Sequence, residues 1–477
     1  MMKVLCVASE AVPFIKTGGL ADVIGSLPQE LHKHKVDVRV VLPLYEDIPQ
    51  EFVSQMELVA ELSVPVSWRQ QYCGVKKLVY QGVTFYFLDN EYYFKRPGLY
   101  GYFDDAERFA WFARAVLEML PVLDFQPDVL HCHDWHAALA VVYLRSLYRD
   151  EAFYQGMKTL FTIHNLRYQG VFGREILGDI LGLGEDVYDE ALEFNQAVNL
   201  MKGALVYADR ISTVSCSYAE EIQQAYYGEG LDGLLRQRQE NLEGIVNGID
   251  YASYDPQKDA HVFVNYDADH LLARRENKAR LQDRLGLPVR RDVPLVAIVS
   301  RLVAPKGLDL IGHILGELVA GEDLQVVVLG TGDAQYEKMF QQMAWDHPNK
   351  VSVNIFFDET LARQIYAAAD LFLMPSQFEP CGIGQMIALR YGAIPIARET
   401  GGLKDTVFSF NKYTGRGNGF TFANYNAHDM LYTIKRALNY FYDRPVWEKI
   451  VRNAMNCDYS WGASAKKYVE VYRNLLR

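Results

Sequence analysis

The 477-residue chain has few cysteines, no excess of positive charge and no long apolar run, and each absence excludes a class of protein. Its six cysteines form no Cys-x-x-Cys pair, so we expect reduced thiols, a cytoplasmic location and no structural zinc. The formal net charge is −12, whereas binders of the nucleic-acid backbone present a basic face, so we expect no nucleic-acid partner. No apolar stretch approaches the ~20 residues that span a bilayer, and we expect no membrane partner.

Short runs rich in Val, Ile and Leu alternate with longer helical patterns, which is typical of an α/β protein with parallel sheets covered on both faces. A polar stretch between Asn247 and Asp292 separates two series of such runs. The first series predicts strands at Lys3–Ala8, Val36–Leu42, Val83–Leu88, Asp128–His131, Thr159–Ile163 and Arg210–Val214. The second predicts strands at Leu295–Val299, Gln325–Leu329, Val351–Phe356, Leu371–Met374 and Ala393–Ile396.

The length of the chain exceeds what one compact core usually holds, so we expect two doubly wound domains. We predict an N-terminal domain over residues 1–246, a second domain over 247–458, and a C-terminal helix over 459–477 that packs back on the first domain. Ligands of such sheets bind outside the carboxyl ends of the strands, so two facing domains imply a cleft between them.

A Gly-Gly loop directly follows the first predicted strand, in the run Lys16-Thr17-Gly18-Gly19-Leu20-Ala21-Asp22. Glycines let the backbone approach a ligand closely, a following helix presents free N–H groups to anionic oxygens, and Lys16 adds a positive charge. The run therefore suggests a diphosphate site, although an ordinary strand-to-helix turn has the same pattern.

Polar residues also follow two later strands of the first half, in His131-Cys132-His133-Asp134-Trp135-His136 and in His164-Asn165. Three histidines with an aspartate suggest a metal site, but there is no His-Glu-x-x-His pattern, and imidazoles at a strand end often only satisfy carbonyl groups. We favour a polar rim of strand ends at the mouth of an active site.

The second half places charged residues after two of its predicted strands. Arg301 and Lys306 lie in the loop Ser300–Gly307, where two cations can neutralise a diphosphate. Glu379 lies in the segment Pro375–Gln385, beside a turn into a helix. It is either a first-turn residue favoured by the helix dipole or a carboxylate that binds sugar hydroxyls.

Taken together, these segments resemble the ADP-glucose-dependent glycogen and starch synthases of bacteria and plants, which are retaining glucosyltransferases of the GT-B fold. The matching motifs occur in the family's order over nearly the whole chain: Lys16–Val23, His133–His136, His164–Asn165, Asn247–Asp250, Ser300–Gly307, Phe378–Gly382 and Thr400–Leu403. The resemblance implies two facing Rossmann-like domains with an inter-domain cleft.

The resemblance also implies transfer of glucose from ADP-glucose to the non-reducing end of an α-1,4-glucan such as glycogen or a malto-oligosaccharide, with retention and without metal or cofactor. Arg301 and Lys306 would neutralise the departing ADP, Glu379 would hold the donor glucose, and His164 would face the anomeric centre; these four are the implied catalytic residues. The implied substrate-binding residues are Lys16, Gly18, Gly19, Asp22, Asp134, Asn165, Asn247, Phe357, Cys381, Gly382 and Ile383.

Three positions depart from the pattern of related enzymes. Ile387 stands where many GT-B enzymes have a second glutamate, an acid that the synthase branch also lacks. Gly384 stands where synthases usually have Thr or Asn. Phe356 replaces the glycine of a Gly-aromatic pair whose aromatic member, Phe357, would stack on adenine.

Three alternatives stay open at this point. One is a GT-B transferase that uses a UDP-sugar, and another is a noncatalytic glucan-binding homologue. The third is a metal-dependent transferase whose ligands are Asp267 and Asp269 of the triplet Asp267-Ala268-Asp269, although that triplet lies in the polar connector, away from strand ends.

Overall fold

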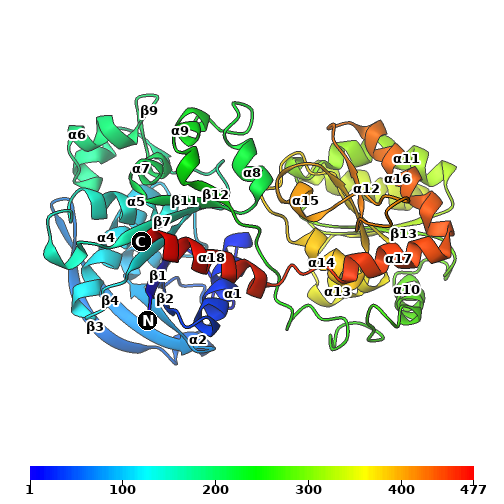
Figure 1. The fold of residues 1–477 in the computed structure, drawn as a ribbon, viewed down its shortest axis with the longest axis horizontal. Coiled ribbons are helices and arrows are strands. Elements are labelled where there is room, and N and C mark those ends of the chain that lie inside the picture. The colour runs from blue at the N-terminus through cyan, green and yellow to red at the C-terminus, as the bar shows by residue number, and fades with distance from the viewer. The chain divides into compact units, whose positions relative to one another are not determined.

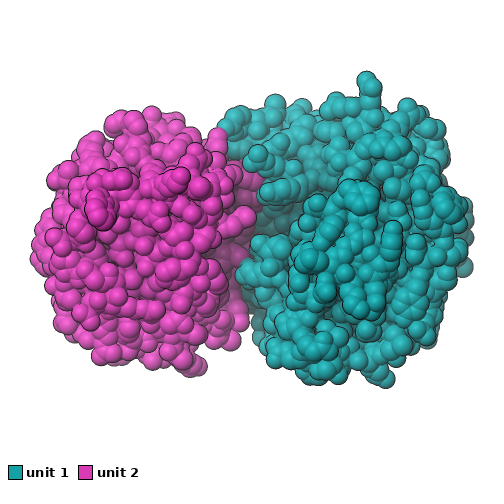
Figure 2. Space-filling view, turned by 180° about the vertical axis from the view of Figure 1, so that it is seen from behind, with its two compact units in different colours: residues 1–245, 461–477 teal, residues 246–460 magenta.

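The structure, a computed structural model, describes all 477 residues. The chain divides into two compact units (Figure 2). Unit 1 comprises Met1–Ile245 and Trp461–Arg477, and unit 2 comprises Val246–Ser460. Each unit has its own sheet with helices packed on it, so the two doubly wound α/β units predicted from the alternating pattern are confirmed (Figure 1). No helix combines the length and apolar character needed to cross a bilayer.

Unit 1 is built on a nine-stranded sheet in the order β12-β11-β7-β6-β1-β2-β5-β4-β3. Neighbouring strands from β12 to β5 are parallel. Their bounds are β1 Lys3–Val7, β2 Asp37–Pro43, β5 Val83–Asp89, β6 Val129–His133, β7 Lys158–Ile163, β11 Arg210–Thr213 and β12 Leu242–Gly244. The chain adds strands on one side of β1 and then returns to its other side at β6, so the topological switch point lies between β1 and β6.

An antiparallel hairpin at the sheet edge was not predicted. It consists of β3 (Glu57–Val66) and β4 (Arg69–Tyr80), and β4 pairs antiparallel with β5. Most of its residues are exposed or partly buried, although a few, such as Val64 and Val75, are buried. The turn at Ser67-Trp68 lacks the Asn-Gly or Gly-rich pair that marks a two-residue hairpin. A second, three-stranded sheet joins β8 (Val171–Phe172), β10 (Ala197–Asn199) and β9 (Glu193–Phe194).

Several helices of unit 1, among them α1, α4, α5 and α8, contact strands of its main sheet, and others, such as α9 and α18, pack on helices. Their bounds are α1 Gly19–Lys33, α2 Gln50–Val53, α3 Glu91–Phe94, α4 Asp105–Val122, α5 Asp134–Arg145, α6 Glu185–Val187, α7 Leu200–Tyr207, α8 Cys216–Glu221, α9 Asp232–Gln237 and α18 Trp461–Leu475. The C-terminal helix α18 packs on α1 (Figure 1), and its Tyr472 hydroxyl lies 2.8 Å from Nδ1 of His131 in β6. The last helix of the chain is therefore part of the core of unit 1.

Unit 2 contains a six-stranded parallel sheet in the order β15-β14-β13-β16-β17-β18. The strands are β13 Leu295–Val299, β14 Gln325–Leu329, β15 Val351–Asn354, β16 Leu371–Met374, β17 Ile394–Arg398 and β18 Phe420–Phe422. Strand β15 ends at Asn354, so the predicted extension to Phe356 is wrong. The order reverses beside β13, and the switch point lies between β13 and β16.

Helices cover the sheet of unit 2 on both faces, as its buried strands require (Figure 1). Their bounds are α10 Leu272–Arg284, α11 Leu308–Gly321, α12 Ala334–Asp346, α13 Glu359–Ala368, α14 Gly384–Tyr391, α15 Gly401–Thr406, α16 Ala427–Tyr442 and α17 Arg444–Met455. The side chain of Asp358 accepts a hydrogen bond from the Leu361 N–H, which fixes the start of α13.

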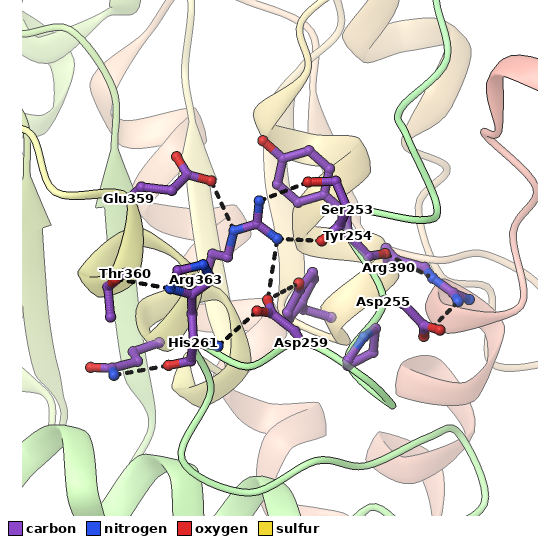
Figure 3. A network of polar contacts seen from close by, with 12 residues as sticks. Ser253, Tyr254, Asp255, Asp259, His261, Glu359, Thr360, Arg363 and Arg390 are labelled. Atoms are coloured by element: carbon purple, nitrogen blue, oxygen red, sulfur yellow. Dashed lines mark hydrogen bonds and ion pairs between the residues drawn. The ribbon is translucent and has the colours of Figure 1, made fainter. Parts of the chain in front are cut away.

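The polar stretch after Asn247 contains no strand, as predicted, and a network of polar contacts fastens it to unit 2 (Figure 3). Arg363 of α13 is the centre of this network. Its guanidinium donates to the Ser253 hydroxyl at 2.9 Å, to Asp259 Oδ2 at 3.3 Å and to Glu359 Oε1 at 2.8 Å. Tyr391 also donates to Asp259, which is buried. Paired charges of this kind hold an irregular segment in place without regular secondary structure.

Candidate active site

Two loops meet at the switch point of unit 2. One follows β13 and contains Arg301 and Lys306, and the other follows β16 and contains Glu379. The Gln377 N–H donates to the Pro305 carbonyl at 2.9 Å, which joins the loops directly. Gly307 has a left-handed φ of 72°, and a Cβ there would lie 2.1 Å from the Pro375 carbonyl oxygen. The loops therefore pack this closely only because residue 307 is glycine.

Glu379 and Lys306 form an ion pair between these loops. The Nζ of Lys306 lies 2.7 Å from Oε2 of Glu379, and the Ser376 hydroxyl donates to the same oxygen at 2.9 Å. Glu379 is only 7% exposed, so this carboxylate is held in a fixed position by two donors. Arg301 of the same loop is exposed, and its guanidinium has no hydrogen bond or ion pair within the chain. The switch point thus combines a fixed carboxylate with a free guanidinium.

The residues after Glu379 form a tight turn into α14. Gly382 has a φ of 75°, and Ile383 is the N-cap of the helix. Burial raises the pKa of the Cys381 thiol to about 12, against a smaller opposite effect of the hydrogen bond from the Asn247 backbone. The Cys381 thiol is therefore neutral at ordinary pH, and Asn247 lies beside it with a buried, unpartnered Oδ1.

The Gly401-Gly402 pair packs directly against the Glu379 loop. The Gly402 N–H donates to the carbonyl groups of Glu379 and Pro380, both at 3.1 Å. A Cβ at Gly401 would lie 2.1 Å from the Glu379 carbonyl oxygen. This second Gly-Gly pair begins the six-residue helix α15. Its role is to let α15 pack closely on the Glu379 loop, which the sequence did not reveal.

The aromatic pair after β15 is solvent-exposed. Phe357 is 80% exposed and Phe356 47% exposed. The structure thus leaves Phe357 available to a planar ligand, as its predicted role requires. Nothing in the structure explains why residue 356 is phenylalanine.

In unit 1, the Gly-Gly loop is organised around Glu10, a residue that the motif analysis missed. Glu10 Oε2 accepts hydrogen bonds from the Thr17 N–H, from the Thr17 hydroxyl at 2.9 Å and from the Gly18 N–H at 3.3 Å. Burial raises the pKa of Glu10, and the hydrogen bonds from Thr17 and Gly18 oppose this. The Thr17 and Gly18 N–H groups, which could bind an anion, thus donate to the Glu10 carboxylate. The sequence did offer a signal for Glu10, since it lies shortly after β1, and polar residues after strands marked the other parts of the site.

The charged side chains of this loop are paired with each other. Lys16 Nζ lies 2.7 Å from Asp22 Oδ1, and both side chains reach solvent. A Cβ added to Gly18 would meet only the Glu10 carboxylate, at 3.8 Å, and the φ of Gly18 is an extended −150°. Neither packing nor backbone conformation explains this glycine. That Gly18 allows the close approach of a ligand stays a prediction.

The three histidines near β6 do not form the predicted rim. Strand β6 continues to His133, so His131 and His133 are fully buried inside unit 1, and His136 is buried in α5. Both ring nitrogens of His131 have partners, the Tyr472 hydroxyl at 2.8 Å and the Thr162 hydroxyl at 2.7 Å. The rim interpretation is wrong for His131 and His133 because the strand ends two residues later than predicted, and for His136 because it is buried in α5.

His131 and His133 have ligand atoms within 4.8 Å of one another and of the Cys6 thiol. Burial raises the pKa of Cys6 to about 12, and both nitrogens of His131 already form hydrogen bonds. A thiol must be deprotonated to bind zinc well. This cluster therefore fits a metal poorly, and we describe it as packed core.

His164, Asp134 and Asn165 come together at the carboxyl ends of β6 and β7. His164 Nε2 lies 3.0 Å from Nδ1 of buried His133, and Asp134 Oδ1 accepts from the His164 N–H at 2.8 Å. Burial lowers the pKa of His164 to about 3, so its imidazole is neutral. Burial also raises the pKa of Asp134 to about 7, against hydrogen bonds from the backbones of His164 and Asn165.

Asp134 has an unusual backbone. Its φ is 56°, which is uncommon for a residue other than glycine, and it begins α5. Strain of this kind persists where the surroundings hold it, and it clusters at functional sites. Asp134, His164 and Asn165 are only partly buried, so this strand-end group reaches the surface of unit 1.

Comparison with known proteins gives matches over nearly the whole chain. The family model described as starch synthase catalytic domain matches residues 3–237, and the model described as glycosyl transferases group 1 matches residues 281–453. The chain is 56% identical over 476 residues to a glycogen synthase of Desulforamulus reducens, covering 100% of this chain and 99% of the relative. It is 57% identical over 477 residues to a glycogen synthase of Geobacillus stearothermophilus, covering 100% and 98%.

Solved structures agree with these matches. The catalytic domain of starch synthase IV from Arabidopsis thaliana, bound to ADP and acarbose, superposes with a TM-score of 0.91 at 33% identity, covering 100% of this chain and 99% of that one. A sucrose-phosphate synthase from Thermosynechococcus elongatus, covering 100% of this chain and 99% of that one, has a TM-score of 0.62 at 16% identity, which shows the fold alone.

Proposed function

Because the chain belongs to the glycogen and starch synthase family of GT-B glycosyltransferases, we propose that it transfers glucose from ADP-glucose to the non-reducing end of an α-1,4-glucan with retention. The acceptors are glycogen and malto-oligosaccharides. The observation that carries this proposal is the ion pair of Glu379 and Lys306, with the unpaired Arg301 beside it, at the switch point of unit 2. Ligands of open α/β sheets bind at this place.

The cations of unit 2 act on the leaving group in this proposal. Arg301 has no partner in the chain, so its guanidinium is free to bind a diphosphate bidentately. Lys306 lies 2.7 Å from the Glu379 carboxylate and supplies a second charge to the same place. Donors placed before reaction stabilise the negative charge that develops as ADP leaves.

The carboxylate of Glu379 holds the hydroxyl groups of the donor glucose, beside the turn Cys381–Ile383, whose N–H groups complete the sugar site. The acceptor hydroxyl then attacks C1 of glucose on the same face from which ADP departs. The bond from C1 to the phosphate oxygen breaks as the new glycosidic bond forms, and the leaving phosphate takes the acceptor proton. This route needs no second carboxylate at the separation that glycosidases use.

Unit 1 supplies the remaining contacts. Lys16, Gly18 and Gly19 bind the diphosphate, with Asp22 holding Lys16 in place through their 2.7 Å ion pair. His164 faces the anomeric centre as a neutral imidazole, and Asp134 and Asn165 lie beside it toward donor and acceptor. Asn247 orders the turn at Cys381, and Phe357 stacks on the adenine. In this proposal residues 1–246 carry the acceptor and the diphosphate loop, residues 247–458 carry the nucleotide-sugar, and residues 459–477 belong with the first domain.

The first test is turnover with ADP-glucose and with UDP-glucose on a glycogen primer. We expect glucan extension with ADP-glucose and a clear preference for it. A preference for UDP-glucose would favour the transferase alternative, and the absence of turnover with either donor would favour a glucan-binding role. We place the reaction in the cytoplasm, where the six cysteines, none of them in a disulfide, stay reduced, and without nucleic acid or membrane as a partner.

The metal-dependent alternative has little support from its own residues. Asp267 Oδ1 accepts from the Asp269 N–H at 2.9 Å and from His270 Nδ1 at 2.7 Å, so it caps its own turn. This arrangement explains the Asp-x-Asp pattern without an ion.

A further inference from the structure

A cavity of unit 2 lies away from the switch point, between α10 and α17. Its volume is about 130 Å³, and the part of the connector around Asp269 forms one side of it. A water needs about 10–15 Å³ of such volume, so the cavity has room for a phosphate group and part of what the group is attached to. The stretch Ala273–Lys278, which the sequence analysis treated only as a polar connector, supplies much of its wall.

The wall of this cavity is strongly basic. Three acidic side chains line it, Asp269, Asp370 and Glu448, against six basic ones. The basic ones are Arg274, Arg275, Lys278, Arg291, Arg444 and Arg452. The chain as a whole has a net charge of −12, so this gathering of cations is not a consequence of composition.

Ion pairs within the chain offset only part of this charge. Lys278 pairs with Asp370 at 2.6 Å, Arg291 with Glu276 at 2.8 Å, and Arg452 with Glu448 at 3.4 Å. The guanidinium groups of Arg275 in α10 and Arg444 in α17 have no ion pair or hydrogen bond in the chain. Two guanidinium groups at one cavity are thus free to bind an anion.

One buried polar atom at the cavity also lacks a partner. Arg274 is only 8% exposed, and its Nε is buried without a hydrogen-bond partner, although another of its nitrogens donates to the Ala369 carbonyl. Leaving a buried charged donor unsatisfied costs free energy. Arg274 also adds a largely buried positive charge to the wall of the cavity.

The cations here also repel one another. Lys278 and Arg444 both lie against the ring of Phe441, at 5.2 and 4.5 Å from its centroid. Burial lowers the pKa of Lys278, Asp370 opposes this, and the charges of Arg274 and Arg444 lower it further. A bound anion would relieve this repulsion.

From the free guanidinium groups, the unpartnered Arg274 Nε and the size of the cavity, we propose that this is a second ligand site, for the phosphate group of a small molecule. Guanidinium groups match the geometry of phosphate oxygens and bind them bidentately. The cavity volume accommodates the phosphate group of a small molecule such as a sugar phosphate or pyrophosphate. The site does not depend on the proposed glucosyl transfer, because none of its residues belongs to that machinery.

Calorimetric titration of the full chain with inorganic phosphate, pyrophosphate and glucose 6-phosphate tests this proposal. We expect binding that the double variant Arg275→Gln with Arg444→Gln weakens by about tenfold or more, since charge-assisted hydrogen bonds contribute about 1.5–3 kcal/mol each. Arg280→Gln is the control. Arg280 lies on α10, as Arg275 does, but does not line the cavity, and the substitution makes the same Arg-to-Gln change there. It should leave affinity within about twofold, as expected for a screened surface charge.

Arg301→Gln separates this cavity from the candidate active site. Phosphate binding that persists in Arg301→Gln and is lost in the double variant supports the proposal. The ligand that binds most tightly among the three identifies the source of the phosphate. Equal binding by wild type and the double variant would overturn it, as would the absence of binding in wild type. Binding lost only in Arg301→Gln would assign the anion to the active site instead. Thermal unfolding of each variant checks that it is folded.

Discussion

Glu379 is the residue on which the proposed chemistry most depends. Its carboxylate accepts from Lys306 and Ser376 and is nearly buried. We predict that Glu379→Gln lowers kcat by about 10²-fold or more, because an amide cannot offset positive charge at the anomeric carbon. Initial rates with ADP-glucose and glycogen measure this.

Glu317→Gln is the control for this substitution, since Glu317 is an exposed residue of α11 that pairs only with Lys435. It should leave kcat unchanged. Turnover by Glu379→Gln at the wild-type level, in a protein with an unchanged melting temperature, would remove Glu379 from the site.

Asp134 makes stability depend on pH. Burial raises its pKa from 3.8 to about 7, so between these values the folded chain keeps a proton that the unfolded chain has released. The stability contributed by this group is therefore present at low pH and is lost as pH rises toward 7. Asn keeps the acceptor for the His164 N–H and carries no charge. We therefore predict that the free energy of unfolding of Asp134→Asn, relative to wild type, is higher at pH 8 than at pH 5 by on the order of 1–2 kcal/mol.

Thermal unfolding at both pH values checks this prediction, with about 2–4 °C expected per kcal/mol. Asp150→Asn removes the same charge at an exposed position of unit 1 that has no partner, and its effect should not change with pH. An equal gain for Asp134→Asn at pH 5 and pH 8 would contradict the assigned cause.

At the scale of elements, helix α13 holds the polar connector through Arg363 (Figure 3). Removing one partner of a buried ion pair leaves the other charge uncompensated, which costs about 3–5 kcal/mol. We predict that Arg363→Met destabilises unit 2 by this amount, because Asp259 keeps only the hydrogen bond from Tyr391 among its side-chain donors. Urea unfolding, followed by hydrogen exchange in peptides of unit 2, measures the loss.

Arg280→Met gives the comparison for this element, since Arg280 is an exposed residue of α10 with a surface ion pair. Its change should stay within about 0.5 kcal/mol. If both variants unfold at the same urea concentration as wild type, the network of Figure 3 does not anchor the connector.

At the scale of the whole molecule, the proposed donor contacts come from both units, so we predict that ADP with a malto-oligosaccharide reduces the radius of gyration measured by small-angle scattering. Binding energy from both units drives such a closure. AMP with the same glucan is the control, since it lacks the second phosphate that the Gly-Gly loop would bind. Identical dimensions with ADP and with AMP would count against closure.

The sequence determined the α/β class, the positions of most parallel strands and the loops that carry the charged residues. It did so because buried parallel strands are continuous apolar runs, and because strand-end glycines and charges are local patterns. Strands β13, β14 and β16 have the predicted bounds, and Arg301, Lys306 and Glu379 lie in the loops at the predicted ends.

Only the tertiary structure decided which of these residues meet. Lys306 and Glu379, which are 73 residues apart in the chain, meet as an ion pair that no local pattern encodes. His131 and His133 are buried in the core because β6 runs two residues further than predicted. Tyr472 of the C-terminal helix also contacts His131 there. The hairpin β3–β4 forms at an edge whose half-exposed residues have no strong apolar signal. Side-chain pairing between segments far apart in the chain depends on topology, whereas a sequence pattern records only neighbours along the chain.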